Sequence, residues 1–578
     1  MSNFSVAAVF SDHMVLQRNK FISIFGQADD GLKIKAKLFD KNHNLLSENE
    51  NSAINGRWLV QLDAQAAQND CLLQITANDS TIEFSDIAIG EVWIAGGQSN
   101  MEFELQNCTE GPAELAQKSN VRFYYTNKIA WKDDNFYKAE KQTCWQTCDS
   151  EWKKAWSAVG YFFAKKLSED LGCTVGVIGC NWGGTSASAW MRKEFLEKDE
   201  DLRTYLTEQE EATKGKSIEQ QCKEYDDYTV ENDAWQIKCN ALYQAEPTIT
   251  WAQVQERIGQ CKWPGPKSCK NPYRPTGLYD CMLSRIMPYT VKGVLWYQGE
   301  SDDHKPQMYA KLFSTMIDNW RTDWHDDSLP FIFVQLPEHR YEQDKDFKNW
   351  CLIREAQAKV HNTVKNAFMT CALDLGQYND IHPKAKKVLA ERMEKNALSN
   401  VYGLLPEKEA MSPMFGEALV QGGFSENATP GAAISGTTTP GSATKANSIG
   451  TITISLKYAD DGLELRDDQK ELAEYKKLEA IQNQTLPEDF TGFEVAGRDG
   501  VYYPATFAFG GTDGKRNLII LSSKKVPEPI FARYAWYNYG PVTIYGKNGL
   551  PLAPFRTSPD DTKEKTDHAE IQQIMTVG

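Results

Sequence analysis

A serine that follows a glycine-rich turn is the first candidate for chemistry in this sequence. Gly96-Gly97-Gln98-Ser99-Asn100-Met101 comes directly after an apolar run that is typical of a buried strand. A serine on such a turn has its hydroxyl lifted clear of the sheet. This geometry suits a nucleophile, because the oxyanion that forms on attack needs N–H groups beside it. The second glycine of a G-x-S-x-G elbow is replaced by Met101, so the α/β-hydrolase elbow is not matched. The alternative is a serine that only caps a helix.

Two further segments place polar groups where predicted strands end. Gly183-Gly184-Thr185 follows an apolar run, and glycines in a turn let a backbone N–H approach a ligand closely. Trp296-Tyr-Gln-Gly-Glu-Ser-Asp302 closes another apolar run. The side-chain amide of Gln298 suits an oxyanion, and the carboxylate of Glu300 suits a group that orients a neighbour. Each segment, taken alone, is also compatible with a plain turn or a solvated loop.

A histidine later in the same part of the chain provides a base. Asp380-Ile381-His382-Pro383 precedes a predicted helix that starts at Lys384. Imidazole titrates near neutral pH, so His382 can accept the serine proton and return it to a leaving group. A carboxylate beside it would fix its tautomer and stabilise the imidazolium. His304 and His325 also stand two residues after an aspartate. The proline and the predicted helix that follow His382 therefore distinguish it from these two histidines as the candidate base.

These segments need a scaffold that brings them together. Between residues 87 and 400, short apolar runs alternate with stretches of helical spacing. This alternation predicts an α/β fold with a parallel sheet and right-handed crossovers. Ligands in such sheets bind outside the carboxyl ends of the strands. Three of the four segments directly follow a predicted strand, which is where a ligand would meet them.

The regions around this sheet have other patterns. Residues 1–86 contain short alternating apolar runs separated by polar turns, which predict a small β-sandwich-like domain. Residues 200–270 are rich in Glu, Lys and Gln, and they predict a helical insertion that is a candidate lid over one edge of the sheet. In residues 401–578 the strand patterns return, which predicts a C-terminal β-rich domain.

Composition narrows the possible partners. The chain has 63 Lys and Arg against 79 Asp and Glu, and its net charge of −16 disfavours nucleic acid and anionic membranes as partners. No run of 18 apolar residues predicts a membrane helix. The 13 cysteines lack zinc spacing, so no structural metal is expected. Chemistry by a serine and a histidine needs no metal or cofactor.

The expected compartment follows from the N-terminus and from one Asn-x-Thr sequence. No signal peptide is recognised at the N-terminus, so the expected location is cytoplasmic, or periplasmic or secreted if a signal was trimmed. A glycan on Asn107 would obstruct the serine, which favours a bacterial-type setting.

Taken together, the four segments resemble the sequence blocks of one enzyme family. Gly-Gln-Ser-Asn-Met, Trp-Gly-Gly-Thr, Trp-Tyr-Gln-Gly-Glu-Ser and Asp-Ile-His-Pro are similar to those of the sialate O-acetylesterases, which belong to the SGNH hydrolases and are related to acetylxylan esterases. The likeness extends to Asp12-His-Met-Val-Leu-Gln-Arg near the start and to Gly549-Leu-Pro-Leu-Ala-Pro-Phe-Arg near the end. The resemblance implies an SGNH-type three-layer parallel sheet with helices on both faces, flanked by the two β-rich domains.

The resemblance also implies a role for each residue. Ser99 would be the nucleophile, His382 the general base and acid, and Asp380 the residue that orients the histidine. The Ser99 N–H, the Gly184 N–H and the Gln298 side chain would form the oxyanion hole.

Two positions depart from the family pattern. Asn379 stands three residues before the histidine, where SGNH enzymes typically have an aspartate, and Gln298 replaces the usual asparagine. Glu300 is therefore the alternative orienting carboxylate, and Asn100 is a candidate for the same supporting role.

The reaction that the resemblance implies is hydrolysis of an O-acetyl ester on a sugar through an acetyl-serine intermediate. The expected substrate is 9-O-acetylated sialic acid, and acetylxylan or another plant glycan is the alternative. A non-catalytic carbohydrate-binding protein is the distant alternative. A pure binder would not need a serine, a histidine, a carboxylate and oxyanion donors together.

Overall fold

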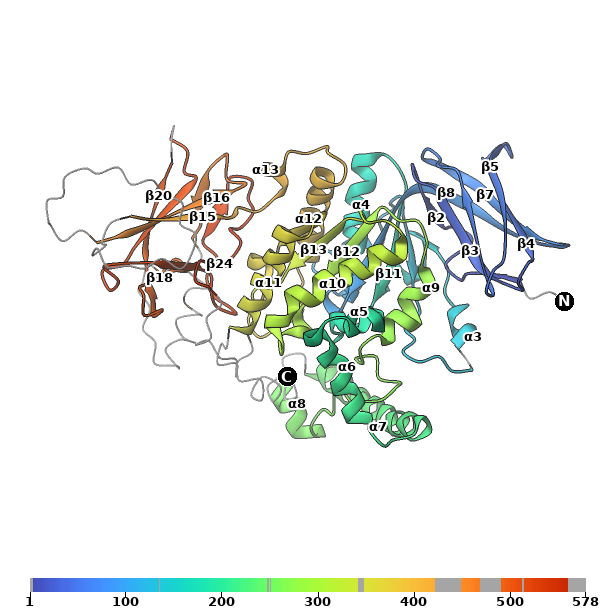
Figure 1. Cartoon of the computed structure of the whole chain (residues 1–578), viewed down its shortest axis with the longest axis horizontal. Helices are drawn as coiled ribbons and strands as arrows, with labels where there is room; N and C mark the ends of the chain where they lie inside the picture. The colour runs from blue at the N-terminus through green and yellow to red at the C-terminus, as the bar shows by residue number, and fades with distance from the viewer. Residues whose placement is uncertain are drawn as a thin grey trace.

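A sheet of mainly parallel strands forms the middle of the molecule (Figure 1). The computed structural model describes residues 4–134, 136–246, 249, 251–340, 348–421, 449–467, 473, 490–511 and 514–559. The central strands run in the order β10-β9-β11-β8-β12-β13-β14, and they are parallel except for the edge strand β10. Strands β11, β12 and β13 are buried along their whole length, as expected where both faces are covered. The bounds are β8 Ser80–Gly97, β9 Val121–Tyr125, β10 Gln146–Thr147, β11 Val175–Asn181, β12 Gly293–Tyr297, β13 Phe331–Gln335 and β14 Ala367–Cys371.

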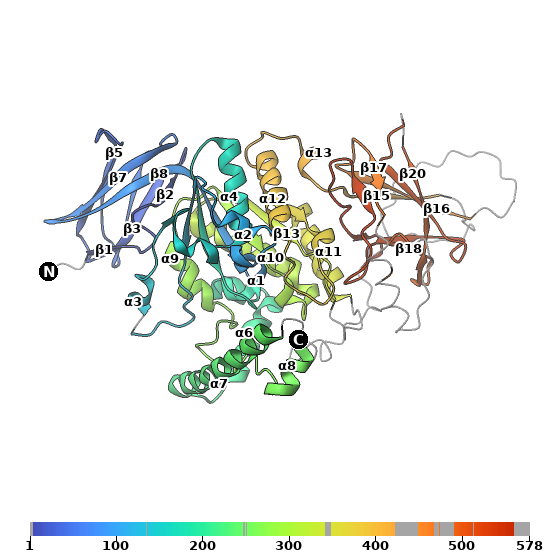
Figure 2. The ribbon, with the colours of Figure 1, turned by 180° about the vertical axis from the view of Figure 1, so that it is seen from behind.

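Helices cover both faces of this sheet (Figures 1 and 2). Helices α4 and α12 pack against each other on one face, and α10 and α11 do so on the other. The hydroxyl of Ser157 caps α4 by accepting the Gly160 N–H at 3.0 Å, and Gly172 ends that helix in the left-handed conformation. The three-layer α/β architecture confirms the predicted fold class. The bounds are α4 Ala158–Leu171, α10 Pro306–Trp324, α11 Asn349–Thr363 and α12 Lys386–Asn400.

Strand β8 is shared by the central sheet and the N-terminal region. Residues 80–86 alternate between exposed and half-buried positions, whereas residues 87–97 are all buried. The first half pairs with β7 and the second half with β11 and β12. The predicted boundary between residues 86 and 87 therefore falls inside one continuous strand. The other N-terminal strands are β1 Phe4–Val6, β2 Val15–Gln17, β3 Ile22–Ala28, β4 Lys33–Phe39, β5 Leu45–Ser52, β6 Arg57–Leu62 and β7 Gln68–Ala77.

The described residues of the 200–270 segment form three helices at one side of the α/β region (Figure 1). Helix α7 is 28 residues long, and only Gln221 and Cys239 are buried in it. A small core of Cys239, Ile249 and Val254 joins α7 to α8. The bounds are α6 Glu200–Thr213, α7 Ile218–Ala245 and α8 Trp251–Ile258. The short helices elsewhere are α1 Ser99–Glu102, α2 Gly111–Glu114, α3 Phe136–Glu140, α5 Lys193–Glu197, α9 Ser284–Ile286 and α13 Glu407–Ala410.

Antiparallel sheets form the C-terminal part (Figure 2). One sheet has the order β15-β16-β21-β20 and another the order β19-β18-β22-β24, while β17 pairs with β23. Arg354 of α11 is fully buried and donates to the carbonyl oxygens of Tyr537 and Asn538, both at 2.9 Å, which ties this part to the α/β region. The bounds are β15 Met414–Gln421, β16 Thr451–Lys457, β17 Leu463–Leu465, β18 Phe493–Ala496, β19 Tyr502–Pro504, β20 Thr506–Gly510, β21 Leu518–Ser522, β22 Phe531–Tyr534, β23 Ile544–Gly546 and β24 Phe555–Arg556.

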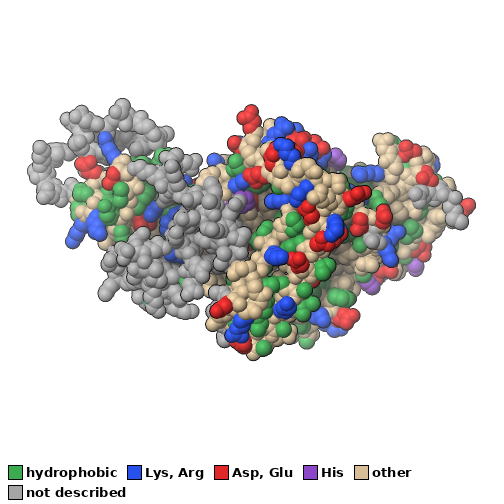
Figure 3. Space-filling model, turned by 90° about the horizontal axis from the view of Figure 1, so that it is seen from below, with side chains coloured by type: hydrophobic (Ala, Val, Ile, Leu, Met, Phe, Trp, Pro, Cys, Tyr) green, Lys and Arg blue, Asp and Glu red, His purple; other side chains and the backbone are tan. Residues whose placement is uncertain are grey.

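The surface carries charges of both signs. Figure 3 shows Lys and Arg side chains interspersed with Asp and Glu on the face seen from below. Across the described ranges, no helix is long and apolar enough to cross a membrane. All 13 cysteines are free thiols.

Candidate active site

Ser99 lies at the start of α1, directly beyond the end of β8. Gly97 has φ +133°, and a Cβ there would lie 2.1 Å from the Tyr297 carbonyl oxygen, so only glycine fits beside β12. Gln98 then accepts the N–H groups of Met101 and Glu102 on its carbonyl oxygen. The Ser99 N–H has no acceptor among the residues that the structure describes. The turn therefore presents a hydroxyl and a free N–H side by side.

His382 lies against Ser99, as the sequence predicts. Its Nε2 is 2.8 Å from the Ser99 Oγ, although the two residues are far apart in the chain. The ring stacks on Phe103, with 6.4 Å between the ring centroids. Burial, and then the positive charge of Lys386, lower the pKa of His382, while Asp380 and Glu102 act in the opposite direction. The lowered pKa favours the neutral, proton-accepting form of the imidazole.

Asp380 contacts the backbone of His382. Its Oδ1 accepts the His382 backbone N–H at 2.9 Å, which fixes the turn that carries the ring. Within the described part of the chain, no hydrogen bond joins Nδ1 of His382 to Asp380 or to Glu300. The choice between Asp380 and Glu300 as the group that orients the ring stays a prediction.

The Gly183-Gly184 turn lies beside the serine. A Cβ on Gly183 would be 3.2 Å from the Ser99 Cβ, so the two segments are in close contact. The Gly183 N–H donates to Glu102 at 2.8 Å. Gly184 has φ +75°, and its N–H meets no acceptor in the described residues. Of these two glycines, Gly184 is the one with an N–H left for a substrate.

Gln298 is fully buried, and both of its amide hydrogens are already donated. Its Nε2 donates to the Thr185 carbonyl oxygen at 3.1 Å and to Asp302 Oδ2 at 2.7 Å. To serve as the predicted oxyanion donor, Gln298 would have to exchange one of these partners for the substrate. Asp302 accepts two further hydrogen bonds, from the Ser186 hydroxyl at 2.6 Å and from the Ala187 N–H at 2.9 Å. It therefore ties the β12 end to the β11 end.

Asn100 and Glu300 lie beneath the serine and are buried. Asn100 Nδ2 donates to Glu300 Oε1 at 2.6 Å and to the Ile381 carbonyl oxygen at 2.9 Å. Desolvation raises the pKa of Glu300, although the Asn100 hydrogen bond and the charge of Lys386 oppose that effect. The sequence analysis missed Lys386, because a lysine near the start of a predicted helix is usually solvated.

The helical insertion supplies a wall of the site, which the sequence analysis did not predict in residue terms. A Cβ on Gly184 would lie 2.8 Å from Trp263 and 3.0 Å from Tyr273, so both half-buried rings pack on this turn. Trp263 Nε1 donates to the Tyr273 hydroxyl at 2.8 Å. The loop that carries them is tied to α7 at Gln221, which accepts the Cys269 N–H at 3.0 Å. The insertion therefore reaches the Gly184 turn through the Trp263 ring.

A half-exposed tryptophan, Trp182, and the ion pair of Lys128 with Glu102 lie at the edge of the site, which we call its mouth. Lys128 pairs with Glu102 and lies 5.6 Å from the centroid of the Trp182 ring. The flat faces of Trp182 and Trp263 suit a sugar ring. In the described part of the chain, no cluster of three His, Cys, Asp or Glu side chains could hold a metal ion.

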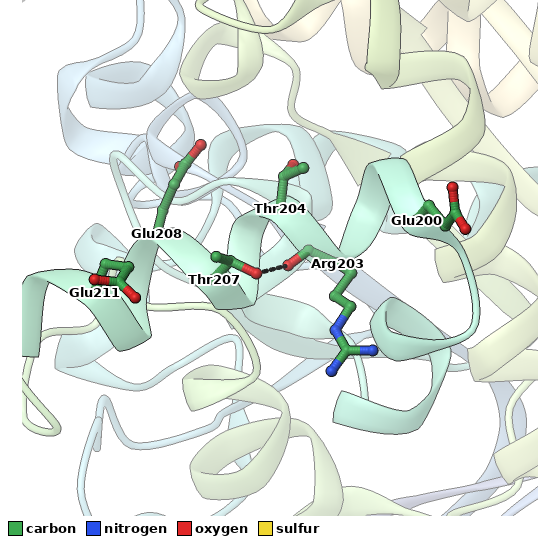
Figure 4. A pocket seen from close by; sticks show the side chains of 6 residues that line it. All are labelled: Glu200, Arg203, Thr204, Thr207, Glu208 and Glu211. Atoms are coloured by element: carbon green, nitrogen blue, oxygen red, sulfur yellow. Dashed lines mark hydrogen bonds between the residues drawn. The ribbon is translucent and has the colours of Figure 1, made fainter. Parts of the chain in front are cut away.

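A separate hollow on α6 differs from this site in every residue (Figure 4). Six residues of that helix line it: Glu200, Arg203, Thr204, Thr207, Glu208 and Glu211. The Thr207 hydroxyl donates a hydrogen bond to the Arg203 carbonyl oxygen at 3.2 Å. Among the six lining residues, no serine, cysteine or histidine provides an activated nucleophile.

Known proteins match the same part of the chain. Residues 89–221 and 254–399 match the family described as carbohydrate esterase, sialic acid-specific acetylesterase. The unmatched gap coincides with α7 and its surroundings. The sialate O-acetylesterase of Mus musculus is 22% identical over 437 residues, which cover 69% of this chain and 74% of that protein. The sialate O-acetylesterase of Homo sapiens is 24% identical over 440 residues, which cover 69% of this chain and 71% of that protein.

One solved structure matches nearly the whole chain. A carbohydrate acetylesterase from Xanthomonas citri superposes with a TM-score of 0.67 at 23% identity, over 96% of this chain and 99% of that one. This likeness shows a shared fold. The family match and the sialate O-acetylesterase relatives identify the α/β part of this chain as a member of the carbohydrate esterases of the sialic acid-specific acetylesterase family, and hence as a carboxylic-ester hydrolase.

Proposed function

We propose that this protein removes acetyl groups from O-acetylated sugars, with 9-O-acetylated sialic acid as its substrate, through an acetyl-serine intermediate. The observation that carries the proposal is the 2.8 Å contact between Ser99 Oγ and His382 Nε2, next to the free N–H groups of Ser99 and Gly184. A serine, a neutral base and uncommitted donors at one point are what acyl transfer requires.

In the first half of the reaction, Ser99 Oγ attacks the acetyl carbonyl carbon while His382 Nε2 takes the hydroxyl proton. The N–H groups of Ser99 and Gly184 stabilise the oxyanion of the tetrahedral intermediate. His382 then donates its proton to the sugar oxygen as the bond to the acetyl carbon breaks. In the second half, His382 takes a proton from water, the hydroxide attacks the acetyl-serine, and acetate leaves as the proton returns to Ser99.

The lowered pKa of His382 supports its role as the base. An imidazole must be neutral to accept a proton, and a lowered pKa keeps it neutral at more acidic pH. The negative charges of Asp380 and Glu102 then stabilise the imidazolium that forms in the transition state.

The aromatic mouth supports a sugar as the alcohol part of the ester. For sialic acid, the cation placed to meet the sugar carboxylate is Lys128, on the rim beside Trp182. Its ion pair with Glu102 favours the second candidate, a neutral glycan such as acetylated xylan, because a substrate carboxylate would compete with Glu102. The names of the mouse and human relatives favour sialic acid.

The test is acetate release from 9-O-acetylated sialic acid and from acetylated xylan, with the wild type and with Ser99→Ala. We expect turnover of the sialic acid ester that falls by a factor of about 10⁴ or more in the variant. Turnover of xylan alone would keep the mechanism and move the protein to the plant-glycan esterases. Near wild-type activity of Ser99→Ala would overturn the mechanism.

Lys128→Met separates the two substrates. If Lys128 meets the sialic acid carboxylate, the variant raises KM for the sialic acid ester by about 10-fold and leaves KM for acetylated xylan unchanged. Lys118→Met, at an exposed lysine paired with Asp149, is the matched control. Equal changes on both substrates would remove Lys128 from substrate recognition.

A further inference from the structure

A buried lysine completes a chain of polar contacts beneath the catalytic serine. Lys386 is 1% exposed, and its Nζ donates to Asn100 Oδ1 at 2.5 Å. The same asparagine donates its amide hydrogens to Glu300 Oε1 and to the Ile381 carbonyl oxygen. Asn100, Glu300 and Lys386 come from the three segments that begin α1, follow β12 and begin α12. We call these three residues the buried clamp.

The charges of the clamp dictate how Asn100 points. An ammonium group has no acceptor, so it must face the amide oxygen, and a carboxylate has no donor, so it must face the amide nitrogen. When Lys386 is protonated and Glu300 is ionised, they therefore hold the Asn100 amide in a single orientation. Rotating it by half a turn would place N–H against the ammonium and C=O against the carboxylate, which low dielectric makes costly.

The orientation matters because of the third contact. Only in this orientation does Asn100 Nδ2 also reach the Ile381 carbonyl oxygen, at 2.9 Å. Ile381 is the residue before His382, and Asn100 is the residue after Ser99. The amide thus joins the backbone next to the base to the backbone next to the nucleophile.

We propose that Lys386, acting through Asn100, is a positioning residue that holds the His382 turn on the Ser99 turn. The inference rests on the proposed function, because it concerns the same serine and histidine. Lys386 touches no reacting atom. Its ring contacts, with Phe103 at 4.9 Å and Tyr297 at 5.2 Å, keep the ammonium in place from two further sides.

Lys386 has a second effect through its charge. Four titratable groups surround His382. Lys386 and His339 act to lower the pKa of His382, and Asp380 and Glu102 act to raise it. Those around Lys386 are Glu300, Asp380 and Cys108. Burial lowers the pKa of Lys386 to about 7, and the charges of Glu300 and Asp380 act against that effect. Because the charge of the Lys386 ammonium lowers the pKa of His382, removing that charge should raise the pKa of His382.

The test is Lys386→Met, which keeps the length and removes the charge, measured as kcat, KM and a pH–rate profile on an acetyl ester. We expect kcat to fall by about 100-fold, as for a small misplacement of catalytic groups, with KM unchanged. We also expect the acidic limb of the profile to move to higher pH. Lys384→Met, at an exposed lysine two residues away, is the matched control and should change neither.

A double variant keeps the test decisive if Lys386→Met folds poorly because Glu300 loses its counter-charge. Lys386→Met/Glu300→Gln removes both charges together, which is less costly than removing one. The kcat of the double variant is compared with those of Lys386→Met and Glu300→Gln. If the clamp acts as a unit, the fold-loss of kcat in the double variant is smaller than the product of the fold-losses in the two single variants. Independent, multiplicative losses, or a Lys386→Met enzyme with unchanged kcat and an unmoved acidic limb, would overturn the proposal.

The failure of the proposed function gives a different result. If Ser99 is not the nucleophile, Ser99→Ala keeps its activity whatever Lys386→Met does. If Ser99→Ala is inactive while Lys386→Met matches the wild type in kcat and pH profile, only the positioning role fails.

Discussion

The strand-end site and the helical insertion are held together in opposite ways. Around Ser99, the side chains that fix the turns are buried and polar: Asn100, Gln298, Glu300, Asp302 and Lys386 are each at most 3% exposed. Helices α7 and α8 of the insertion rely mainly on surface ion pairs such as Lys223–Asp227 and on a small apolar core. Buried polar groups tolerate only one arrangement, whereas surface pairs contribute little and exchange easily with water. The turns around Ser99 are thus held by contacts that allow little rearrangement.

The two regions meet at Trp263 and Tyr273. Trp263 belongs to the insertion and Tyr273 follows it closely in the chain, and both rings pack on Gly184 of the site. The comparison therefore predicts large effects for changes in the buried network, intermediate ones at the aromatic contact, and none on the outer face of α7.

The largest effect is expected for His382→Ala. The variant loses the base that accepts the Ser99 proton, so kcat for an acetyl ester should fall by roughly 10⁴–10⁶-fold. The measurement is steady-state acetate release, with circular dichroism to verify the fold. His43→Ala, at an exposed histidine in the turn between β4 and β5, is the control. A loss below about 10-fold would remove His382 from the mechanism.

The next effect is expected for Asp302→Asn. Three donors converge on this carboxylate, and an amide supplies one oxygen and adds two hydrogens of its own. At least one buried donor is left without an acceptor, which should lower the free energy of unfolding by about 1–3 kcal/mol. Urea unfolding followed by tryptophan fluorescence measures it. An unchanged midpoint, equal to that of the exposed control Asp79→Asn, would contradict the structural role.

Trp263→Ala tests the contact between the two regions. Loss of the ring should lower kcat/KM for an acetylated sugar by about 10-fold, since stacking on an aromatic face is lost. A small aryl acetate has no sugar to stack, so its kcat/KM should change less. Trp152→Ala is the control, because Trp152 is 58% exposed and lies outside the insertion. Equal losses on both esters would mean that Trp263 supports the oxyanion turn instead of the sugar.

The smallest effect is expected for Lys223→Ala on α7. The side chain forms an exposed pair with Asp227 at 2.6 Å, and such pairs contribute little. Activity and the thermal midpoint should stay within experimental error of the wild type. A clear loss of activity, with the fold intact, would show that the outer face of the insertion is coupled to the site.

Much of the fold could be predicted from sequence, because parallel strands leave strong patterns. The apolar runs before Ser99, Gly184 and Gln298 are β8, β11 and β12, which are neighbours in the sheet. Adjacent parallel strands end at the same edge, so a serine and a glycine turn that follow them meet in space. The predicted boundary at residue 86 corresponds to a real change, from one-sided to two-sided burial, but the backbone continues through it.

What sequence could not predict depends on contacts between distant segments. Residue type alone suited Gln298 to an oxyanion, and its commitment to Asp302 and Thr185 appears only in three dimensions. A lysine near a helix start is usually solvated, so the burial of Lys386 had no local signal. Trp263 lies in a charged, helix-rich segment, and nothing near it in the chain marks Gly184 as its neighbour.

Strand β8 has a consequence for exchanging parts between related esterases. One end of this strand pairs with β7 of the N-terminal sheet, and the other carries Ser99 two residues beyond its last glycine. A recombination junction at the compositional boundary would splice two parents in the middle of a strand, where both sheets depend on one register. Junctions that leave the strand whole lie before Ser80 or beyond Gly97. With a junction before Ser80, β8 must pair with β7 of the other parent, and with a junction beyond Gly97 it must pair with β11 and β12 of the other parent.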